Sequence, residues 1–209
     1  VVTRPGAEDL AAFTQRLTRA QQPLLVLGGS GWSPDGVAAI TRFAEAWDLP
    51  VGCSFRRQDR LDNMSEHYVG DVGIGINPKL AARVKESDCL VLLGGRLGEM
   101  PSSGYSLLQI PDPAQPFIHV HAGAEELGRV YQPDLAINAT PGAFAEALAK
   151  LPAPTAKPWA AWRKEARADY LAWSTPPKTP GPLQMGEVIR TLEQRLGPDA
   201  IWCNGAGNY

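Results

Sequence analysis

The chain has 209 residues, of which 44% are apolar and 20% are charged, and its formal net charge is −2. This apolar content can bury the core of one full domain with an appendage. Charges of both signs are interspersed, which argues against nucleic acid or an anionic membrane as partner. Apolar runs are far shorter than the ~20 residues that cross a bilayer, and no signal-peptide pattern opens the chain. We therefore expect a soluble, cytoplasmic protein.

Apolar residues recur at helical spacing in the first part of the chain. An amphipathic helix is predicted at about residues 8–20, where Leu10, Phe13 and Leu17 share one face. Three further helices are predicted to begin at prolines, because each proline follows a residue type that caps helix N-termini. The three pairs are Ser33–Pro34, Asn77–Pro78 and Thr140–Pro141.

Short apolar runs without polar alternation lie between these helices. They cover residues 23–28, 50–54, 89–94, 117–120 and 135–138. Such runs are typical of strands that are covered on both faces, as in a parallel sheet. The alternation of strands and helices predicts a doubly wound α/β fold, a mainly parallel sheet with helices on both faces.

The rest of the chain reads as connectors and helices. A helix predicted at residues 159–173 carries an aromatic stripe, which we expect to pack on a neighbouring domain because no basic residues accompany it on that face. After a proline-rich connector, an amphipathic helix runs from Met185 to Leu196. A short apolar strand is then predicted at residues 200–203, before a glycine-rich turn.

These elements predict three parts along the chain. Residues 1–151 form a central α/β domain, and residues 152–183 form a linker with one helix. Residues 184–209 are the beginning of a further α/β domain, and we expect the chain to be a fragment of a larger enzyme.

The first predicted strand ends in a glycine turn, Gly28-Gly29-Ser30-Gly31, just before the helix start at Ser33. A strand, a glycine turn and a helix N-terminus can together receive a nucleotide pyrophosphate. However, the third glycine of the dinucleotide fingerprint would fall at Pro34. The pattern therefore fits equally well with glycines that only allow a tight turn.

Another predicted strand ends in Gly94-Gly95-Arg96. An arginine at the carboxyl edge of a parallel sheet lies where such sheets bind ligands, and its fork of donors suits phosphate or carboxylate. An interdomain salt bridge would explain Arg96 equally well. We also predict that residues 70–75 form a flexible strand-to-helix loop that lines a cleft.

Few other residues suggest chemistry. His119 and His121 should share one sheet face, but no carboxylate or cysteine with ligand spacing accompanies them. Cys53, Cys89 and Cys203 form no CxxC pair, and we interpret them as buried small hydrophobes. With no nucleophile elbow or Walker motif either, the sequence predicts neither a catalytic residue nor a metal ligand.

The ordered set of motifs resembles the central domain of thiamine-diphosphate-dependent enzymes, above all the acetolactate synthase group. The motifs are Pro23–Gly31, Leu49–Val51, Val69–Gly73, Ser87–Arg96 and Ile118–Val120. The resemblance covers about residues 8–151. The terminal Asn204-Gly-Ala-Gly-Asn-Tyr209 looks like the entry into the third domain of those enzymes.

The resemblance implies where the active site is built. Gly207, Asn208 and Tyr209 match the segment that contacts the cofactor's diphosphate. The activating glutamate belongs to the N-terminal domain of that family, and the Mg²⁺ ligands belong to the third domain. The chain alone is therefore expected to hold no complete active site and to be inactive.

The resemblance also implies a possible second cofactor. Gly28, Gly29, Gly31 and Arg96 match positions that line a FAD or ADP pocket in several members. Flavin-binding members read Ile-His-Ile-Asp-Ile-Asp where this chain reads Ile118-His-Val-His-Ala-Gly123, so both acidic positions are replaced. The segment after Arg96 also lacks the aspartate pair and arginine of flavin binders. These departures argue against FAD.

The activity implied by the resemblance is carboligation or decarboxylation of a 2-oxo acid such as pyruvate, in a homodimer or homotetramer. An oxalyl-CoA-decarboxylase-like enzyme, with an ADP moiety in the central domain, is a second interpretation. A non-catalytic nucleotide- or FAD-binding domain related to electron-transfer flavoproteins is a third.

Overall fold

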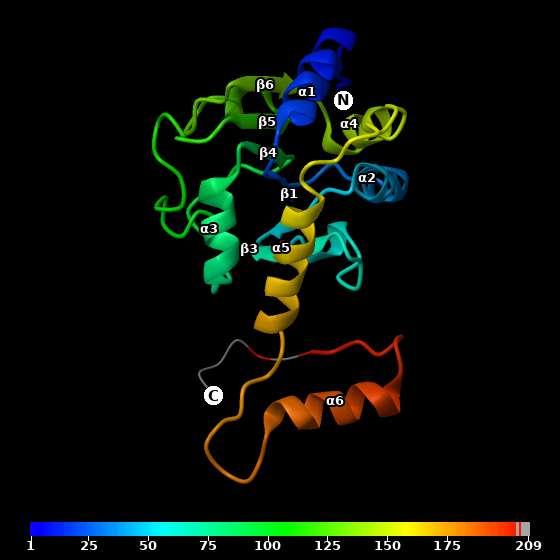
Figure 1. The fold of residues 1–209 in the computed structure, drawn as a ribbon, viewed down its shortest axis with the longest axis vertical. Coiled ribbons are helices and arrows are strands. Elements are labelled where there is room, and N and C mark those ends of the chain that lie inside the picture. Colours follow the sequence, from blue (N-terminus) through cyan, green and yellow to red (C-terminus); the bar gives the residue numbers. More distant parts are fainter. Residues whose placement is uncertain (204, 206–209) are drawn as a thin grey trace. The chain divides into compact units, whose positions relative to one another are not determined.

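The computed structural model describes residues 1–203 and 205 (Figure 1). The chain divides into two compact units, Val1–Ala172 and Trp173–Tyr209, which we describe separately. None of the helices in the described residues is both long and apolar enough to span a membrane.

The first unit is built on a six-stranded sheet with the order β3-β2-β1-β4-β5-β6, in which every neighbouring pair is parallel. The chain moves outward from β1 in one direction and from β4 in the other. This is the doubly wound α/β fold that the sequence predicts. The strands are β1 (Pro23–Leu27), β2 (Val51–Ser54), β3 (Tyr68–Val72), β4 (Cys89–Leu93), β5 (Phe117–His121) and β6 (Leu135–Asn138).

Helices cover both faces of this sheet. Apolar side chains of α1, α2 and α4 join one buried cluster, and those of α3 join the cluster on the opposite face together with the long segment that follows β4. Figure 1 shows α3 on the other side of the sheet from α2 and α4. The helices are α1 (Ala7–Arg19), α2 (Pro34–Trp47), α3 (Pro78–Glu86), α4 (Pro141–Leu148), α5 (Ala160–Trp173) and α6 (Met185–Leu196), with 3-10 turns η1 (Gln58–Arg60) and η2 (Ala124–Glu126).

Two of the three predicted helix caps are confirmed. Ser33 Oγ accepts a hydrogen bond from the Gly36 N–H (3.0 Å), and Asn77 Oδ1 accepts one from the Lys79 N–H (3.0 Å). Thr140 makes no side-chain cap, because its Oγ1 instead accepts from the Thr3 N–H (3.0 Å). The Thr140 side chain therefore ties the start of the chain to the beginning of α4.

The prediction of a loop at residues 70–75 is wrong for its first half. Residues 70–72 belong to β3, an edge strand that pairs with β2. Gly70 and Asp71 interrupt the apolar run that would identify a strand. The backbone is also irregular here, since Gly70 has φ +121 and the pairing with β2 shifts register beside it. Pairing with β2, rather than local preference, makes this segment a strand.

Helix α5 belongs to the first compact unit up to Ala172, although the sequence places this helix in a linker of residues 152–183. Trp162 and Ala166 of the aromatic stripe are buried, whereas Trp173 is 56% exposed. The stripe therefore packs only in part, and it does so within the unit to which the helix belongs rather than on a neighbouring domain. The expected lack of basic residues beside it is wrong, since Arg163 and Arg167 are also buried there. The three predicted domain boundaries stay a prediction.

The second unit contains α6, which begins and ends at the predicted residues. No strand is found at residues 200–203, contrary to the sequence prediction, since a strand requires a hydrogen-bonded neighbour and this segment pairs with no strand in the described residues. The exposed Cys203 likewise contradicts its expected burial, whereas Cys53 and Cys89 are buried.

Candidate functional site

A cleft of the first unit lies at the carboxyl edge of the sheet, beyond the ends of β1, β2, β4 and β5. Its volume is about 820 Å³, within the range of small-molecule sites. The strand order reverses between β1 and β4, and open α/β sheets bind ligands at such a switch point. The lining includes Gly29, Ser54, Arg56, Arg57, Arg96 and Glu125.

The predicted glycine turn lies in this cleft, and its backbone packs against the loop after β4. Gly29 has φ +69, and a Cβ there would overlap the Gly94 carbonyl oxygen. A Cβ on Gly28 would lie 3.0 Å from the Gly95 Cα. Close approach of two loops therefore explains both glycines without a ligand. Gly31, at φ +85, lies against the side chains of Thr140 and Pro141.

The N-terminus of α2 offers little to a phosphate. The Ser33 hydroxyl already accepts from the Gly36 N–H, and Pro34 has no N–H to donate. Asp35 adds a carboxylate to the first turn, where the helix dipole would otherwise attract an anion. Binding groups in the cleft must therefore come mainly from side chains.

Two arginines that the sequence analysis missed stand directly after β2. Arg57 Nε donates to the Gly29 carbonyl (2.6 Å) and its Nη1 donates to the Arg56 carbonyl (2.9 Å). The Arg56 guanidinium lies over the Phe55 ring, 5.1 Å from its centroid. Neither arginine forms an ion pair with a carboxylate among the described residues. Their position directly after a buried strand, at the carboxyl edge, was the signal that could have found them.

Arg96 is where the sequence predicts it, in the cleft and largely exposed. Its Nη1 lies 3.6 Å from Glu126 Oε1, and the same oxygen lies 3.0 Å from Arg129 Nη1. The interdomain salt bridge considered for Arg96 is not the ion pair that the structure contains, because Arg96 and Glu126 both lie in the first unit. Because Glu126 is shared with Arg129, it neutralises Arg96 only in part.

The two histidines of β5 have different environments. Their ring centroids are 5.8 Å apart, which confirms that they share a sheet face. His119 is buried and its Nε2 lies 2.9 Å from the Gly95 carbonyl. Burial lowers the pKa of His119 to about 4, so the ring is neutral at pH 7 and donates to that carbonyl. His121 lines the cleft, and its Nδ1 accepts a hydrogen bond from the Gly123 N–H (3.0 Å).

A carboxylate occupies the space beside Gly123. A Cβ on Gly123 would lie 2.6 Å from Glu125 Oε1, and Glu125 lines the cleft. The resemblance leads one to expect an acidic side chain at residue 123, and Glu125 brings a carboxylate to the same space. Sequence reasoning missed it because Glu125 stands two residues further along.

Other predicted residues play no part in the described cleft. Burial raises the pKa of the Cys53 and Cys89 thiols to about 12, so both stay protonated. Within the described residues, no group of three His, Cys, Asp or Glu side chains is arranged to hold a metal ion. Gly207, Asn208 and Tyr209, predicted to contact thiamine diphosphate, lie outside the described residues.

The chain shows a family relationship that agrees with this geometry. Residues 10–148 match the family described as thiamine pyrophosphate enzyme, central domain. The chain therefore belongs to the thiamine pyrophosphate enzyme family, through its central domain. This confirms the resemblance inferred from the sequence motifs.

Curated relatives include several acetolactate synthases. The large subunit of acetolactate synthase from Corynebacterium glutamicum is 24% identical over 218 residues, covering 100% of this chain and 34% of the relative. The large subunit of acetolactate synthase isozyme 2 from Escherichia coli is 26% identical over 147 residues, covering 70% of this chain and 26% of the relative.

A relative with another name is also similar. The 3D-(3,5/4)-trihydroxycyclohexane-1,2-dione hydrolase 2 of Bacillus cereus is 25% identical over 107 residues, covering 50% of this chain and 16% of the relative. The chain spans about a third or less of the length of these relatives.

Proposed function

We propose that the protein containing this chain is a thiamine-diphosphate-dependent carboligase or decarboxylase that acts on a 2-oxo acid such as pyruvate. The observation that supports it most is the match of the whole chain to acetolactate synthase, together with the family match over residues 10–148. When bound, thiamine diphosphate supplies the electron sink that decarboxylation of a 2-oxo acid requires.

In this proposal the chain contributes binding rather than proton transfer. Gly207, Asn208 and Tyr209 would contact the cofactor's diphosphate, while the activating glutamate and the Mg²⁺ ligands would come from other parts of the protein. We expect a homodimer or homotetramer, because such a cofactor is placed between domains of two subunits. Gel filtration of the active protein tests this, and an active monomer would contradict it.

We further propose that the cleft holds the ADP moiety of a nucleotide. Of the four residues that the resemblance assigns to such a pocket, Gly29 and Arg96 line the cleft, and Gly28 and Gly31 belong to the same turn as Gly29. The volume of about 820 Å³ and the three arginines of the lining fit a phosphorylated ligand of this size. The replaced acidic positions His121 and Gly123 argue against FAD. The absorbance spectrum of the purified protein tests this, since flavin bands would show that FAD is bound.

An oxalyl-CoA-decarboxylase-like activity is the second candidate, and the observation that favours it is the same cleft. A coenzyme A thioester would then be the substrate in place of pyruvate. A non-catalytic nucleotide-binding domain is the third.

One assay separates these candidates. The complete protein is supplied with thiamine diphosphate and Mg²⁺ and offered pyruvate or oxalyl-CoA, and release of CO₂ is measured. Turnover of pyruvate that depends on both cofactors is expected. Turnover of oxalyl-CoA alone would favour the second candidate. A protein that neither binds thiamine diphosphate nor releases CO₂ would contradict both enzyme proposals.

A further inference from the structure

We infer that a second pocket, beneath the segments that follow β4 and β5, binds a small zwitterion, namely an α-amino acid with an apolar side chain. Arg129 binds the carboxylate of this ligand, and Glu99 and the ring of His119 accept hydrogen bonds from its ammonium group. Nothing in the proposed function assigns a role to this pocket.

The pocket is separate from the cleft. Its volume is about 300 Å³, at the lower end of the range for small-molecule sites. The His119 ring stacks with Phe117, 5.6 Å between ring centroids, so the β5 wall of the pocket is on the face of the sheet that α3 covers. The Arg96–Glu126 ion pair lines both the pocket and the cleft and is their common border. The lining includes Arg96, Glu99, Tyr105, His119, Arg129 and Tyr131.

A buried side chain brings an unused acceptor to this pocket. His119 is 4% exposed, and its Nε2 donates to the Gly95 carbonyl (2.9 Å). A carbonyl can only accept, so the single hydrogen of the neutral ring is on Nε2 and Nδ1 is an acceptor. Nδ1 has no hydrogen-bond partner among the described residues, yet it is not one of the buried atoms that are sealed from solvent. Because buried polar atoms are normally paired, this acceptor points to a ligand that donates a hydrogen bond.

The charges that line the pocket are only partly paired. Arg96 Nη1 and Arg129 Nη1 lie 3.6 Å and 3.0 Å from the same Glu126 oxygen, so one carboxylate serves two guanidinium groups. Glu99 also lines the pocket, and it forms no ion pair in the described part of the chain. One positive and one negative charge are therefore available to a ligand. A zwitterion complements both, whereas a simple anion or cation complements only one of them.

The wall that carries Glu99 is fixed in a strained conformation. Leu97, Ser103 and Tyr105 have φ values of +45, +53 and +63. The buried Ser102 holds this loop, since its Oγ donates to the Glu99 carbonyl (3.3 Å) and accepts from the Tyr105 N–H (2.9 Å). Such conformations are costly for residues other than glycine and are concentrated at ligand-binding sites.

The rest of the lining is suited to an apolar side chain. The rings of Tyr105 and Tyr131 and the side chain of Val130 line the pocket beside the charged groups. Aromatic rings bury apolar groups well. We therefore expect the pocket to favour an amino acid with an apolar side chain over a small one.

Calorimetric titration of the complete protein tests this assignment. Thiamine diphosphate and Mg²⁺ are kept saturating, and the probes carry no 2-oxo group, so no turnover adds heat. The probes are L-phenylalanine, L-alanine, 3-phenylpropionate, which lacks the ammonium group, and L-phenylalaninamide, which lacks the carboxylate. The variants are Glu99→Gln, Arg129→Gln and His119→Gln. Arg56→Gln, which removes an exposed arginine of the neighbouring cleft, is the matched control.

We expect the wild-type protein to bind L-phenylalanine about tenfold more tightly than either analogue, because each analogue leaves a charged group of the pocket without its partner. L-alanine should also bind more weakly, since it lacks the ring that the tyrosines bury. Arg129→Gln should remove most of the preference over phenylalaninamide, and Glu99→Gln most of the preference over 3-phenylpropionate.

The histidine variant isolates one hydrogen bond. His119→Gln keeps an N–H for the Gly95 carbonyl but loses the Nδ1 acceptor, so it should weaken the binding of L-phenylalanine and not that of 3-phenylpropionate. Arg56→Gln should bind all the probes like the wild type.

Three results would overturn the assignment. The wild-type protein could bind neither amino acid, or Glu99→Gln and Arg129→Gln could both bind L-phenylalanine within about twofold of the wild type. Arg56→Gln could also weaken binding as much as they do, which would place the ligand in the neighbouring cleft. Because Glu99 and Arg129 are exposed, their variants give this answer even where His119→Gln does not fold. None of these results bears on the proposed activity.

Discussion

The two edges of the central sheet use the same residue types in opposite ways. At the amino edge, α5 lies across the beginnings of β1 and β3, and the arginines around it have partners within hydrogen-bonding distance. At the carboxyl edge, Arg56 and Arg57 have no carboxylate partner among the described residues, and Arg96 shares one with Arg129. An arginine near the sheet is therefore structural or available to a ligand according to what surrounds its guanidinium group.

The tryptophans show how closely the amino edge is packed. Trp159 Nε1 donates to the Trp47 carbonyl and Trp162 Nε1 donates to the Pro23 carbonyl, both at 2.9 Å. Both indoles are buried. The N–H of each buried indole is thus satisfied by a backbone carbonyl, one at the end of α2 and the other at the start of β1.

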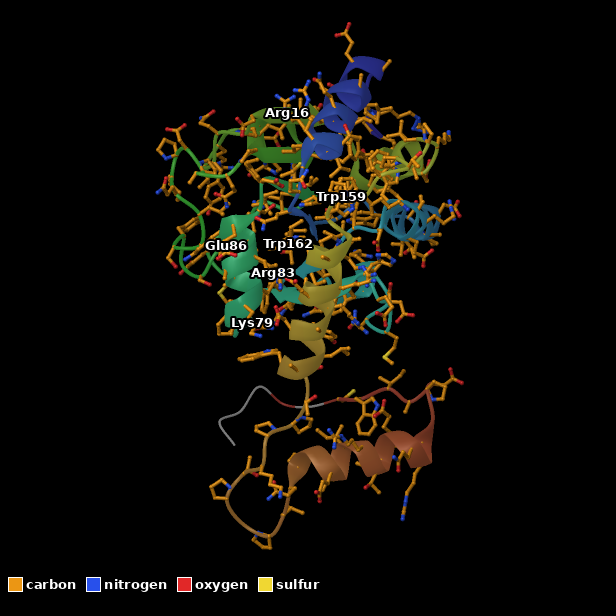
Figure 2. All side chains as sticks on the ribbon, in the orientation of Figure 1. Arg16, Lys79, Arg83, Glu86, Trp159 and Trp162 are labelled. Atoms are coloured by element: carbon orange, nitrogen blue, oxygen red, sulfur yellow. The ribbon has the colours of Figure 1, made fainter. Side chains whose placement is uncertain are left out.

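The charged groups beside these rings are paired as well. Arg83 Nη2 lies 2.7 Å from Asp169 Oδ2 and Lys79 Nζ lies 2.6 Å from Asp169 Oδ1, which joins α3 to α5 (Figure 2). Burial alone would raise the pKa of Asp169, but hydrogen bonds from Lys79 and Arg83 outweigh it and hold the pKa below its usual value. Arg163 Nε donates to Asp48 Oδ1 (2.9 Å).

The largest effect is expected at the amino edge. Trp159→Ala leaves a cavity and an unsatisfied Trp47 carbonyl, and should lower the free energy of unfolding by about 3–5 kcal/mol. Trp173→Ala, at the exposed end of α5, which follows Trp159 directly, is the matched control and should change it by less than about 0.5 kcal/mol. Chemical denaturation measures both, and equal effects would show that α5 is not held through Trp159.

A second pair of variants compares the edges directly. Arg167 donates to the carbonyls of Asn63, Met64 and Tyr68 at the amino edge. Arg167→Met should cost about 2–4 kcal/mol, because several buried acceptors lose their donor. Arg56→Met should cost less than about 0.5 kcal/mol. Similar losses of stability in the two variants would contradict the distinction between the edges.

Lowering the pH should destabilise the protein through His119. Its folded pKa of about 4 lies below the usual value of 6.5, so this contribution to stability is complete above pH 6.5 and is lost as the pH falls toward 4. Between pH 6.5 and 5 the expected loss is about 2 kcal/mol. His119→Gln should reduce this pH dependence, and an unchanged dependence in the variant would assign it to other groups.

The smallest effect concerns Asp71 on β3. Its Oδ1 is buried without a partner in the described part of the chain, and burial raises the pKa to about 6. The charged form therefore costs stability above pH 6, and the cost disappears below the usual value of 3.8. Asp71→Asn should stabilise the protein by about 1–2 kcal/mol at pH 7.5 and not at pH 3.5. Stabilisation that is equal at both pH values would rule out the charge as its cause.

Local signals were sufficient for most of the fold. The cap-and-proline pairs at Ser33 and Asn77 identified helices, and the continuous apolar runs identified strands. Both signals are local, because capping and hydrophobic periodicity depend on neighbours in the chain. The strand β3 was missed, since Gly70 and Asp71 interrupt its apolar pattern and only pairing with β2 defines it. Arg96 and the glycine turn predicted the position of the cleft, but Arg56, Arg57 and Glu125, which also line it, were not predicted.

By itself, the sequence determined the doubly wound fold and the family, and it predicted a ligand site at the carboxyl edge of the sheet. Only the tertiary structure decided which arginines are free. Arg56 and Arg167 look equally polar in the sequence, and their difference depends on whether backbone carbonyls from distant residues come within reach. It also decided that the Glu125 carboxylate fills the space beside Gly123. Such contacts depend on how the strand ends and loops meet in space, which no local pattern encodes.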